Sequence, residues 1–229
     1  MTDLSVIIPA AGSGSRMGSD IPKPFLRLGE MTILERTIRC FDRPDRVLSI
    51  IISVSSDWLD FTRSMVQTLD VKPAVLVVEG GSERMYSIKN ALAVVPAETK
   101  YIAVHDAVRP FLSSELFNAL IEAAENFEAV VPGIAVTDTI KIKDDSGFVV
   151  STPNRDTLVA VQTPQVFGKA VINEAYKLAI LRDYTGTDDA SLVELSGHKI
   201  RLIPGDPNNF KITWPDDIEK AEKFINRFK

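Results

Sequence analysis

The stretch that decides the fold is LSVIIP at Leu4–Pro9, which runs directly into AAGSGSRMG at Ala10–Gly18. A short apolar run rich in β-branched residues predicts a buried strand, and the small residues after it predict a tight loop. Backbone N–H groups gathered in such a loop suit a phosphate group. For the glycines taken alone, the structural alternative is a simple Gly/Ser turn.

Two familiar phosphate loops do not fit this stretch. The kinase and ATPase loop requires Gly-Lys-Ser/Thr after its second glycine, and the dinucleotide fingerprint fails because Gly18 comes one position late and Pro22 interrupts the expected helix. Two cations, Arg16 and Lys23, lie on the loop and just beyond it. Such charges suit a triphosphate and favour a functional interpretation, because Arg offers a bidentate fork and Lys a point charge.

Farther along the chain, short apolar runs alternate with segments whose apolar residues repeat at helical spacing. The predicted strands after the first are Val47–Val54, Ala74–Val78, Tyr101–Val104, Ala129–Val131 and Ile200–Ile203. The predicted helices are Thr32–Phe41, Trp58–Leu69, Glu83–Val94 and Ser114–Phe127, with helical patterning again after Phe167 and from Pro215 to Phe228. The alternation predicts a single α/β domain over residues 1–229, with a mostly parallel, twisted sheet covered on both faces.

Residues 137–160 break this pattern and predict a β-hairpin arm. Two apolar segments, Thr139–Ile142 and Phe148–Val150, flank the turn-rich stretch Asp144–Gly147. An isolated two-stranded hairpin is barely stable in water, so the apolar side chains of the arm need a covering surface. A second subunit and the arm's own domain are equally good candidates for that surface.

Composition excludes several classes of protein and of metal site. The net charge of −5 argues against binding to nucleic-acid polymers, which depends on Lys and Arg. One cysteine, Cys40, and no long apolar segment near the start predict a cytoplasmic protein without disulfides or a membrane span. With only His105 and His198 besides that cysteine, a zinc cluster is excluded, so any catalytic metal should have oxygen ligands.

A series of motifs in a fixed order resembles the 2-C-methyl-D-erythritol 4-phosphate cytidylyltransferase family over nearly the whole chain. The motifs are Pro9–Met17, Pro22-Lys23, Gly80–Arg84 with Ser87, His105–Pro110, Thr163–Gln165 and Asn209–Thr213. The resemblance implies a Rossmann-like nucleotidyltransferase domain that uses Mg²⁺ and CTP to convert a small polyol phosphate into its CDP-linked form. It also implies a homodimer in which the arm reaches the neighbouring subunit.

The resemblance assigns roles residue by residue. The residues expected to bind the nucleotide are Ala10, Ala11, Gly12, Gly14, Gly81, Ser82 and Ser87. Arg16, Lys23 and Lys211 are expected to act on the reacting phosphates. Asp106 is expected to hold the metal and contact the substrate, with Arg109 in the substrate pocket. On the arm, Thr139 and Arg155 match the positions that hold the acceptor's phosphate.

Several of these residues have ordinary structural explanations as well. Asp106 follows a predicted strand, where ligands bind in parallel sheets, yet it could simply cap a helix or pair with Arg109. Ser82 could be a helix N-cap, and Lys211 an exposed strand lysine. Asn208 and Asn209 stand where many family members carry an Asp near this lysine, which weakens the expectation of a second protein ligand for Mg²⁺.

Other polar groups are expected to be structural. The Asp188-Asp189 and Asp216-Asp217 pairs suit the first turns of helices, and His105 is assigned no catalytic part. Arg84 is a candidate for holding its loop.

Three competing functions remain open. The nearest is a ribitol 5-phosphate cytidylyltransferase, which shares most of these motifs. A nicotinamide-dependent dehydrogenase suits the α/β pattern but lacks the glycine spacing. A non-catalytic nucleotide-binding regulator would not need Arg16, Lys23, Asp106 and Lys211 together, because binding alone does not require charge aimed at a transition state.

Overall fold

The computed structural model describes residues 3–12, 21–43 and 45–226. Its strands are β1 (Leu4–Pro9), β2 (Arg27–Leu28), β3 (Met31–Thr32), β4 (Val47–Val54), β5 (Ala74–Glu79), β6 (Tyr101–Val104), β7 (Ala129–Ala135), β8 (Ile142–Lys143), β9 (Val149–Ser151), β10 (Val159–Val161), β11 (Gln165–Gly168) and β12 (Arg201–Pro204). Its α-helices are α1 (Ile33–Arg39), α2 (Leu59–Thr68), α3 (Arg84–Leu92), α4 (Ser114–Ala124), α5 (Lys169–Leu181), α6 (Asp189–Leu195) and α7 (Pro215–Asn226). Short 3-10 turns lie at η2 (Lys23–Phe25), η3 (Ser56–Trp58) and η4 (Arg155–Thr157).

The main sheet has eight strands in the order β10-β7-β11-β6-β1-β4-β5, with β12 beside β7. Strands β6, β1, β4 and β5 are parallel to one another, and β12 is parallel to β7, so the predicted mostly parallel sheet is confirmed. Elsewhere in the sheet, β11 runs antiparallel between β6 and β7, and β10 runs antiparallel to the end of β7. The sequence prediction included neither β10 nor β11.

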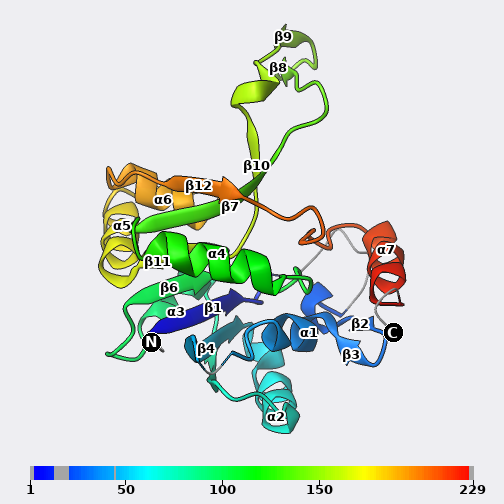
Figure 1. Ribbon diagram of the computed structural model, residues 1–229, viewed down its shortest axis with the longest axis vertical. Helices are drawn as coiled ribbons and strands as arrows, with labels where there is room; N and C mark the ends of the chain where they lie inside the picture. Colours follow the sequence, from blue (N-terminus) through cyan, green and yellow to red (C-terminus); the bar gives the residue numbers. More distant parts are fainter. Residues whose placement is uncertain (1–2, 13–20, 44, 227–229) are drawn as a thin grey trace.

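Helices cover both faces of the sheet, as predicted, because successive side chains of a strand point to opposite faces. On β1, Val6 and Ile8 pack into a cluster with side chains of α1, α2 and α4. The intervening Ile7 packs on the other face with side chains of α3, α5 and α6. All three side chains are fully buried, so β1 is the centre of the core (Figure 1).

Local sequence explains where two of the helices begin. Thr32 is the N-cap of α1, where its side chain accepts from Glu35 N at 3.1 Å and the Glu35 side chain accepts from Thr32 N. Asp188 caps α6 in the same way with Ser191, which confirms the capping role predicted for this acidic pair. Within the described residues, no helix is long and apolar enough to cross a membrane.

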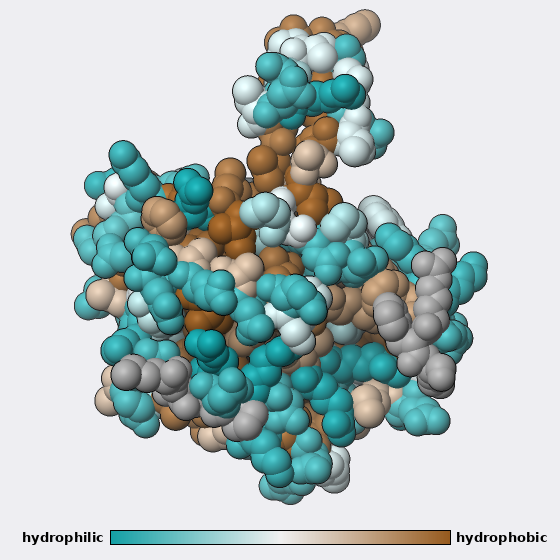
Figure 2. All heavy atoms as spheres, viewed as in Figure 1, coloured by the Kyte–Doolittle hydropathy of each residue, from teal (hydrophilic) through white to brown (hydrophobic). Residues whose placement is uncertain are grey.

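The predicted arm projects from the body of the molecule, beyond the end of the sheet (Figure 1). It leaves at the end of β7 and returns at β10, and its antiparallel strands β8 and β9 are shorter than the predicted segments. Residues 159 and 160, which the sequence assigned to the arm, pair with β7 in the main sheet. Ile142 is 51% exposed and Phe148 is 73% exposed, so the arm does not fold back onto its own domain. Hydrophobic residues lie at its tip and along its neck in Figure 2.

Candidate active site

A pocket of about 630 Å³ opens at the carboxyl ends of the parallel strands, where α/β proteins commonly bind ligands. Its walls come from loops that follow β1, β5 and β6, together with η2 and the segment before α7. The lining residues are Pro9, Ala10, Ala11, Gly12, Lys23, Pro24, Gly81, Ser82, Glu83, Arg84, Ser87, Asp106, Ala107, Val108 and Lys211.

The residues predicted to bind the nucleotide lie together in this pocket, as far as the structure describes them. Ala10, Ala11 and Gly12 form one wall, and Gly81, Ser82 and Ser87 form part of another. Gly14 and Arg16 belong to the same prediction but lie outside the described residues.

The pocket loops that follow β1 and β5 touch each other, and glycine permits this contact. A Cβ atom on Gly80 would lie 2.6 Å from Ala11 Cβ, and one on Gly81 would lie 2.3 Å from Tyr86 Cβ. Ser87 Oγ fixes the second loop, accepting from Gly81 N at 3.0 Å and donating to Glu83 O at 3.0 Å. The N-cap of α3 is Glu83, so the suggestion that Ser82 caps this helix is wrong.

Lys23 is a buried cation, with 6% of its surface exposed. It begins η2, and Phe25 at the end of this turn stacks on Trp58 with ring centroids 4.2 Å apart. Lys23 Nζ donates to Thr213 O at 2.7 Å. Lys23 also lines the pocket, which places a positive charge beside the space open to a ligand.

Asp106 is the acidic centre of the pocket. Its carboxylate oxygen Oδ2 lies 3.1 Å from Lys211 Nζ and 3.2 Å from Arg109 Nε. Burial raises the pKa of Asp106, but Lys211, Arg84 and Arg109 outweigh it and lower the pKa to about 2. The carboxylate is therefore ionised at neutral pH.

Lys211 and Arg109 have different positions around this carboxylate. Lys211 lines the pocket and is 43% exposed, so it can turn toward a ligand, and it lies in an irregular segment instead of a strand. Arg109 is buried behind Asp106 and does not line the pocket, and its Nη1 donates to Asn209 O at 2.8 Å. The structural alternative of an Asp106–Arg109 pair is thus confirmed, alongside a place in the pocket for Asp106.

Arg84 adds a further cation to the pocket wall. Its Nη2 lies 2.6 Å from Oδ2 of Asp189, whose side chain is fully buried. Tyr176 donates its hydroxyl hydrogen to Oδ1 of the same carboxylate at 2.6 Å. Burial lowers the pKa of Arg84, but Asp189 raises it above its usual range, so the guanidinium stays charged.

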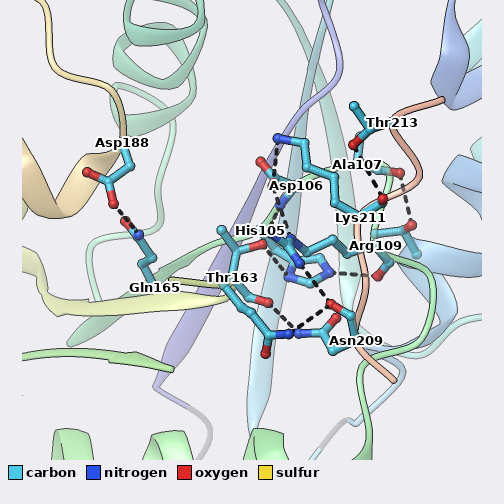
Figure 3. A network of polar contacts seen from close by, with 12 residues as sticks. His105, Asp106, Ala107, Arg109, Thr163, Gln165, Asp188, Asn209, Lys211 and Thr213 are labelled. Carbon is cyan, nitrogen blue, oxygen red and sulfur yellow. Dashed lines mark hydrogen bonds and ion pairs between the residues drawn. The ribbon is translucent and has the colours of Figure 1, made fainter. Parts of the chain in front are cut away.

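A hydrogen-bonded network lies directly beneath Asp106 (Figure 3). Asp106 N donates to Thr163 Oγ1 at 3.0 Å, and this hydroxyl lies 3.2 Å from His105 Nδ1. His105 Nε2 lies 2.9 Å from Arg109 O. Burial lowers the pKa of His105 to about 4, so its ring is neutral at physiological pH.

Asp106 is the one acidic side chain of the pocket that the sequence assigned to a metal. Mg²⁺ commonly takes one or two carboxylates together with substrate oxygens and water, and an ionised Asp106 fits that requirement. Asn209 is fully buried with its amide donating to Thr163 O, and Asn208 faces a different pocket beside α7. Among the described residues, no cluster of three or more His, Cys, Asp or Glu side chains could hold a metal.

Thr139 and Arg155 do not line the pocket of their own chain. Both belong to the projecting arm, where Arg155 Nη1 donates to Thr137 O at 3.2 Å. Their predicted contact with an acceptor phosphate requires the pocket of another subunit and stays a prediction.

A family model described as 2-C-methyl-D-erythritol 4-phosphate cytidylyltransferase matches residues 4–227. The chain belongs to the 2-C-methyl-D-erythritol 4-phosphate cytidylyltransferase family. Proteins of that name from Symbiobacterium thermophilum and Caldanaerobacter subterraneus subsp. tengcongensis are 43% and 35% identical to it. These alignments cover 97% and 98% of this chain, and 92% and 100% of the relatives.

Solved structures of the cytidylyltransferase family have the same fold. The crystal structure of 4-diphosphocytidyl-2C-methyl-D-erythritol synthase from Anaerococcus prevotii has a TM-score of 0.86 at 32% identity, covering 99% of both chains. The 2-C-methyl-D-erythritol 4-phosphate cytidylyltransferase from Thermus thermophilus has a TM-score of 0.80 at 31% identity, covering 99% of this chain and 100% of the other.

Sequence reasoning missed the side chains that support this cytidylyltransferase site. Thr163 was part of a motif but had no role, and Asp189 was explained as a helix-terminal residue. The position of Arg84, a cation directly after the Gly80-Gly81 loop, suggested that it has a role there. Its partner Asp189 could not be named, because it lies 105 residues away in the sequence. Only the fold brings the two together.

We expect Asp189→Asn to destabilise the protein by about 2 kcal/mol, because the fully buried carboxylate accepts charge-assisted hydrogen bonds that an amide would weaken. Urea denaturation measures this. Asp60→Asn, which removes one partner of an exposed ion pair with Arg63, is the control and should change stability by less than about 1 kcal/mol. Equal effects of the two substitutions would contradict a structural role for the buried Asp189 carboxylate.

Proposed function

We propose that this protein transfers the cytidylyl group of CTP to 2-C-methyl-D-erythritol 4-phosphate and releases pyrophosphate. The observation that carries the proposal is the convergence of Lys23, Lys211 and ionised Asp106 in one pocket with the two glycine-containing loops. The family and the names of its members agree with this chemistry. Such a pocket pairs fixed hydrogen-bonding groups for a base with charge for its phosphates.

The reaction requires positioning and charge neutralisation more than proton transfer. The acceptor's phosphate monoester is largely dianionic at neutral pH, because its second pKa is about 6. One of its oxygens attacks the α-phosphorus of CTP, a new P–O bond forms, and the bond to the β-phosphate oxygen breaks. No general base is needed, which agrees with a pocket that His105 does not line.

The pocket cations would oppose the charge that develops during this transfer. Lys23 is held from behind by its turn and its bond to Thr213 O, so its ammonium group is already in place before a ligand binds. Lys211 can exchange its contact with Asp106 for a phosphate oxygen. Preorganised cations of this kind stabilise a transition state without being reorganised during the reaction. Arg16 is proposed as a third cation from family resemblance alone.

Cytosine recognition is proposed for the loops around Gly81 and Ala10. Backbone groups of Ala10, Ala11 and Gly81, with the Ser82 hydroxyl, can present fixed donors and acceptors to a base edge. Ser87 contributes by holding Gly81 through its hydroxyl. The contact between the two loops keeps these groups at a fixed separation.

We further propose Mg²⁺ as the cofactor, held by Asp106 and by phosphate oxygens of the nucleotide. When bound, the ion would neutralise phosphate charge and favour departure of pyrophosphate. Reaction in the cytoplasm is likewise proposed, and the free thiol of Cys40 suits a reducing compartment.

The substrate assay decides the function. Pyrophosphate release should require both CTP and 2-C-methyl-D-erythritol 4-phosphate, and should fall at least about 100-fold when ATP, GTP or UTP replaces CTP, because buried polar groups would be left unpaired. Ribitol 5-phosphate is the matched acceptor control. Faster turnover with ribitol 5-phosphate would identify the protein as a ribitol 5-phosphate cytidylyltransferase instead. Pyrophosphate release without any acceptor would rule out both functions.

Substitution of the two cations tests the mechanism. Lys23→Ala and Lys211→Ala should each lower kcat about 100-fold, because each removes charge that stabilises the transition state. The dissociation constant for cytidine should change little, since cytidine lacks the phosphates these residues act on. Calorimetry with cytidine and steady-state kinetics separate the two effects. Lys72→Ala, at an exposed ion pair with Asp70, is the control, and near-normal kcat in both pocket variants contradicts the mechanism.

The projecting arm leads us to propose a homodimer in which Thr139 and Arg155 of one subunit complete the acceptor site of the other. The arm extends away from its own pocket, and its exposed apolar side chains need a surface to cover them. A closed two-fold dimer would supply this surface to both arms at once.

Mixing two inactive variants tests the exchange. In a dimer of one Arg155→Ala subunit and one Lys23→Ala subunit, arm exchange gives one site with both residues intact. Random mixing in equal amounts should therefore restore about a quarter of the normal activity per subunit. If each arm serves its own pocket, no mixed dimer has an intact site, and activity stays at the level of the separate variants.

A further inference from the structure

His105 is fully buried and forms part of a closed ring of hydrogen bonds that contains Asp106. The ring runs from Asp106 N to Thr163 Oγ1, from this hydroxyl to His105 Nδ1, and from His105 Nε2 to Arg109 O. Arg109 closes it twice, through N to Asp106 O at 3.1 Å and through Nε to Asp106 Oδ2 at 3.2 Å. Figure 3 shows His105, Asp106, Arg109 and Thr163 meeting in this network.

The chemistry of the partners indicates which ring nitrogen of His105 carries the hydrogen. A carbonyl oxygen can only accept, so His105 Nε2 must carry a hydrogen and donate it to Arg109 O. The backbone N–H of Asp106 can only donate, so Thr163 Oγ1 accepts it and keeps its own hydrogen to give. A neutral ring with its hydrogen on Nε2 leaves Nδ1 as an acceptor, and the Thr163 hydroxyl, 3.2 Å away, can then donate to it.

The resulting arrangement links both the backbone and the carboxylate of Asp106, through their partners, to one imidazole ring. The Thr163 hydroxyl, oriented by Nδ1, holds the backbone of Asp106, while the Arg109 backbone, held by Nε2, carries the guanidinium that contacts the carboxylate. Asn209 connects the same segments. Its side-chain amide donates to Thr163 O at 2.8 Å, and its backbone carbonyl accepts from Arg109 Nη1.

We propose that His105, in the neutral form with hydrogen on Nε2, is a positioning residue that fixes the carboxylate of Asp106 toward the pocket. This inference rests on the proposed function, in which Asp106 acts at the phosphates. His105 does not line the pocket itself and so acts through its neighbours. A displacement of about 1 Å at a reacting centre can cost about 100-fold in rate, so such fixation matters for catalysis.

Histidine suits this place because its ring offers one donor and one acceptor in a rigid, planar frame. The ring also packs edge-on against Phe41, with centroids 5.1 Å apart. Phenylalanine would keep much of this shape while losing both hydrogen bonds. Glutamine can reproduce the Nε2 donor to Arg109 O but lacks the rigid acceptor facing Thr163.

Nuclear magnetic resonance of the ring nitrogens tests the hydrogen arrangement without measuring activity. The chain has two histidines, so a His198→Gln variant labelled with ¹⁵N-histidine reports on His105 alone. At pH 7 we expect a protonated Nε2 and an unprotonated Nδ1. A hydrogen on Nδ1, in either the other neutral form or the charged ring, overturns the proposal. This outcome is independent of whether the substrate assignment holds.

Kinetics of ring variants test the positioning role. His105→Phe should lower kcat about 10- to 100-fold, with the KM for CTP within about threefold, because the base-binding loops lie elsewhere. His105→Gln should recover part of the loss. Phe117→Leu, beside Phe41 in the same core, is a control that should lower stability and leave kcat unchanged. Unchanged kcat in His105→Phe overturns the proposal.

A second pair of variants decides the question if His105→Phe fails to fold. Thr163→Val removes the hydroxyl at nearly constant shape and should lower kcat while shifting the Nδ1 signal of His105. Thr163→Ser keeps the hydroxyl and should preserve both values. Full activity in Thr163→Val contradicts the proposal. An inactive wild-type protein that still shows hydrogen on Nε2 would reject the proposed function and leave the hydrogen arrangement standing.

Discussion

The site depends on one electrostatic balance, which keeps a nearly buried carboxylate ionised. Burial by itself favours the neutral acid, yet Lys211, Arg84 and Arg109 hold the pKa of Asp106 at about 2. These cations come from three separate parts of the chain, and in the assembled fold together they outweigh the effect of burial on the Asp106 carboxyl. The arrangement also explains why basic groups can gather near one another before any phosphate is present, since Asp106 and Asp189 offset their repulsion.

The sheet provides the frame in which this balance forms. Parallel strands β1, β4, β5 and β6 end at the same edge, and the loops after three of them carry the uncharged and the acidic parts of the pocket. The strand β11 then runs antiparallel beside β6. This places Thr163, just before β11, against the backbone of Asp106, just after β6. The hydrogen-bonded network around Asp106 therefore depends on β11 being antiparallel to β6.

Much of the fold could be predicted because its signals are local. The strand Leu4–Pro9 was predicted with its observed bounds, since a short β-branched run next to small residues has few alternatives. The arm was recognisable from a break in helical spacing. Strands β10 and β11 were missed, because three or four residues carry little periodicity and their pairing with β7 and β6 depends on distant segments.

Prediction of the site divides in the same way. Lys23 and Asp106 could be named partly because a charge beside a glycine loop or at a strand end suggests a function, whereas Lys211 was named from family resemblance alone. The partners that hold them could not be named. His105 looks like any core histidine in the sequence, and its contacts with Thr163 and Arg109 become visible only when donors and acceptors can be counted in space.

The bond between Lys23 Nζ and Thr213 O joins residues 190 positions apart. When about the first four-fifths of the chain has left the ribosome, β1, β4, β5, β6 and Lys23 have been made, but Lys211 and the carbonyl that restrains Lys23 have not. The central sheet can therefore form during synthesis well before the pocket is complete. A nucleotide that bound to such a partial chain would contact Lys23 but not Lys211. The complete set of cations for its phosphates is therefore present only when translation is nearly finished.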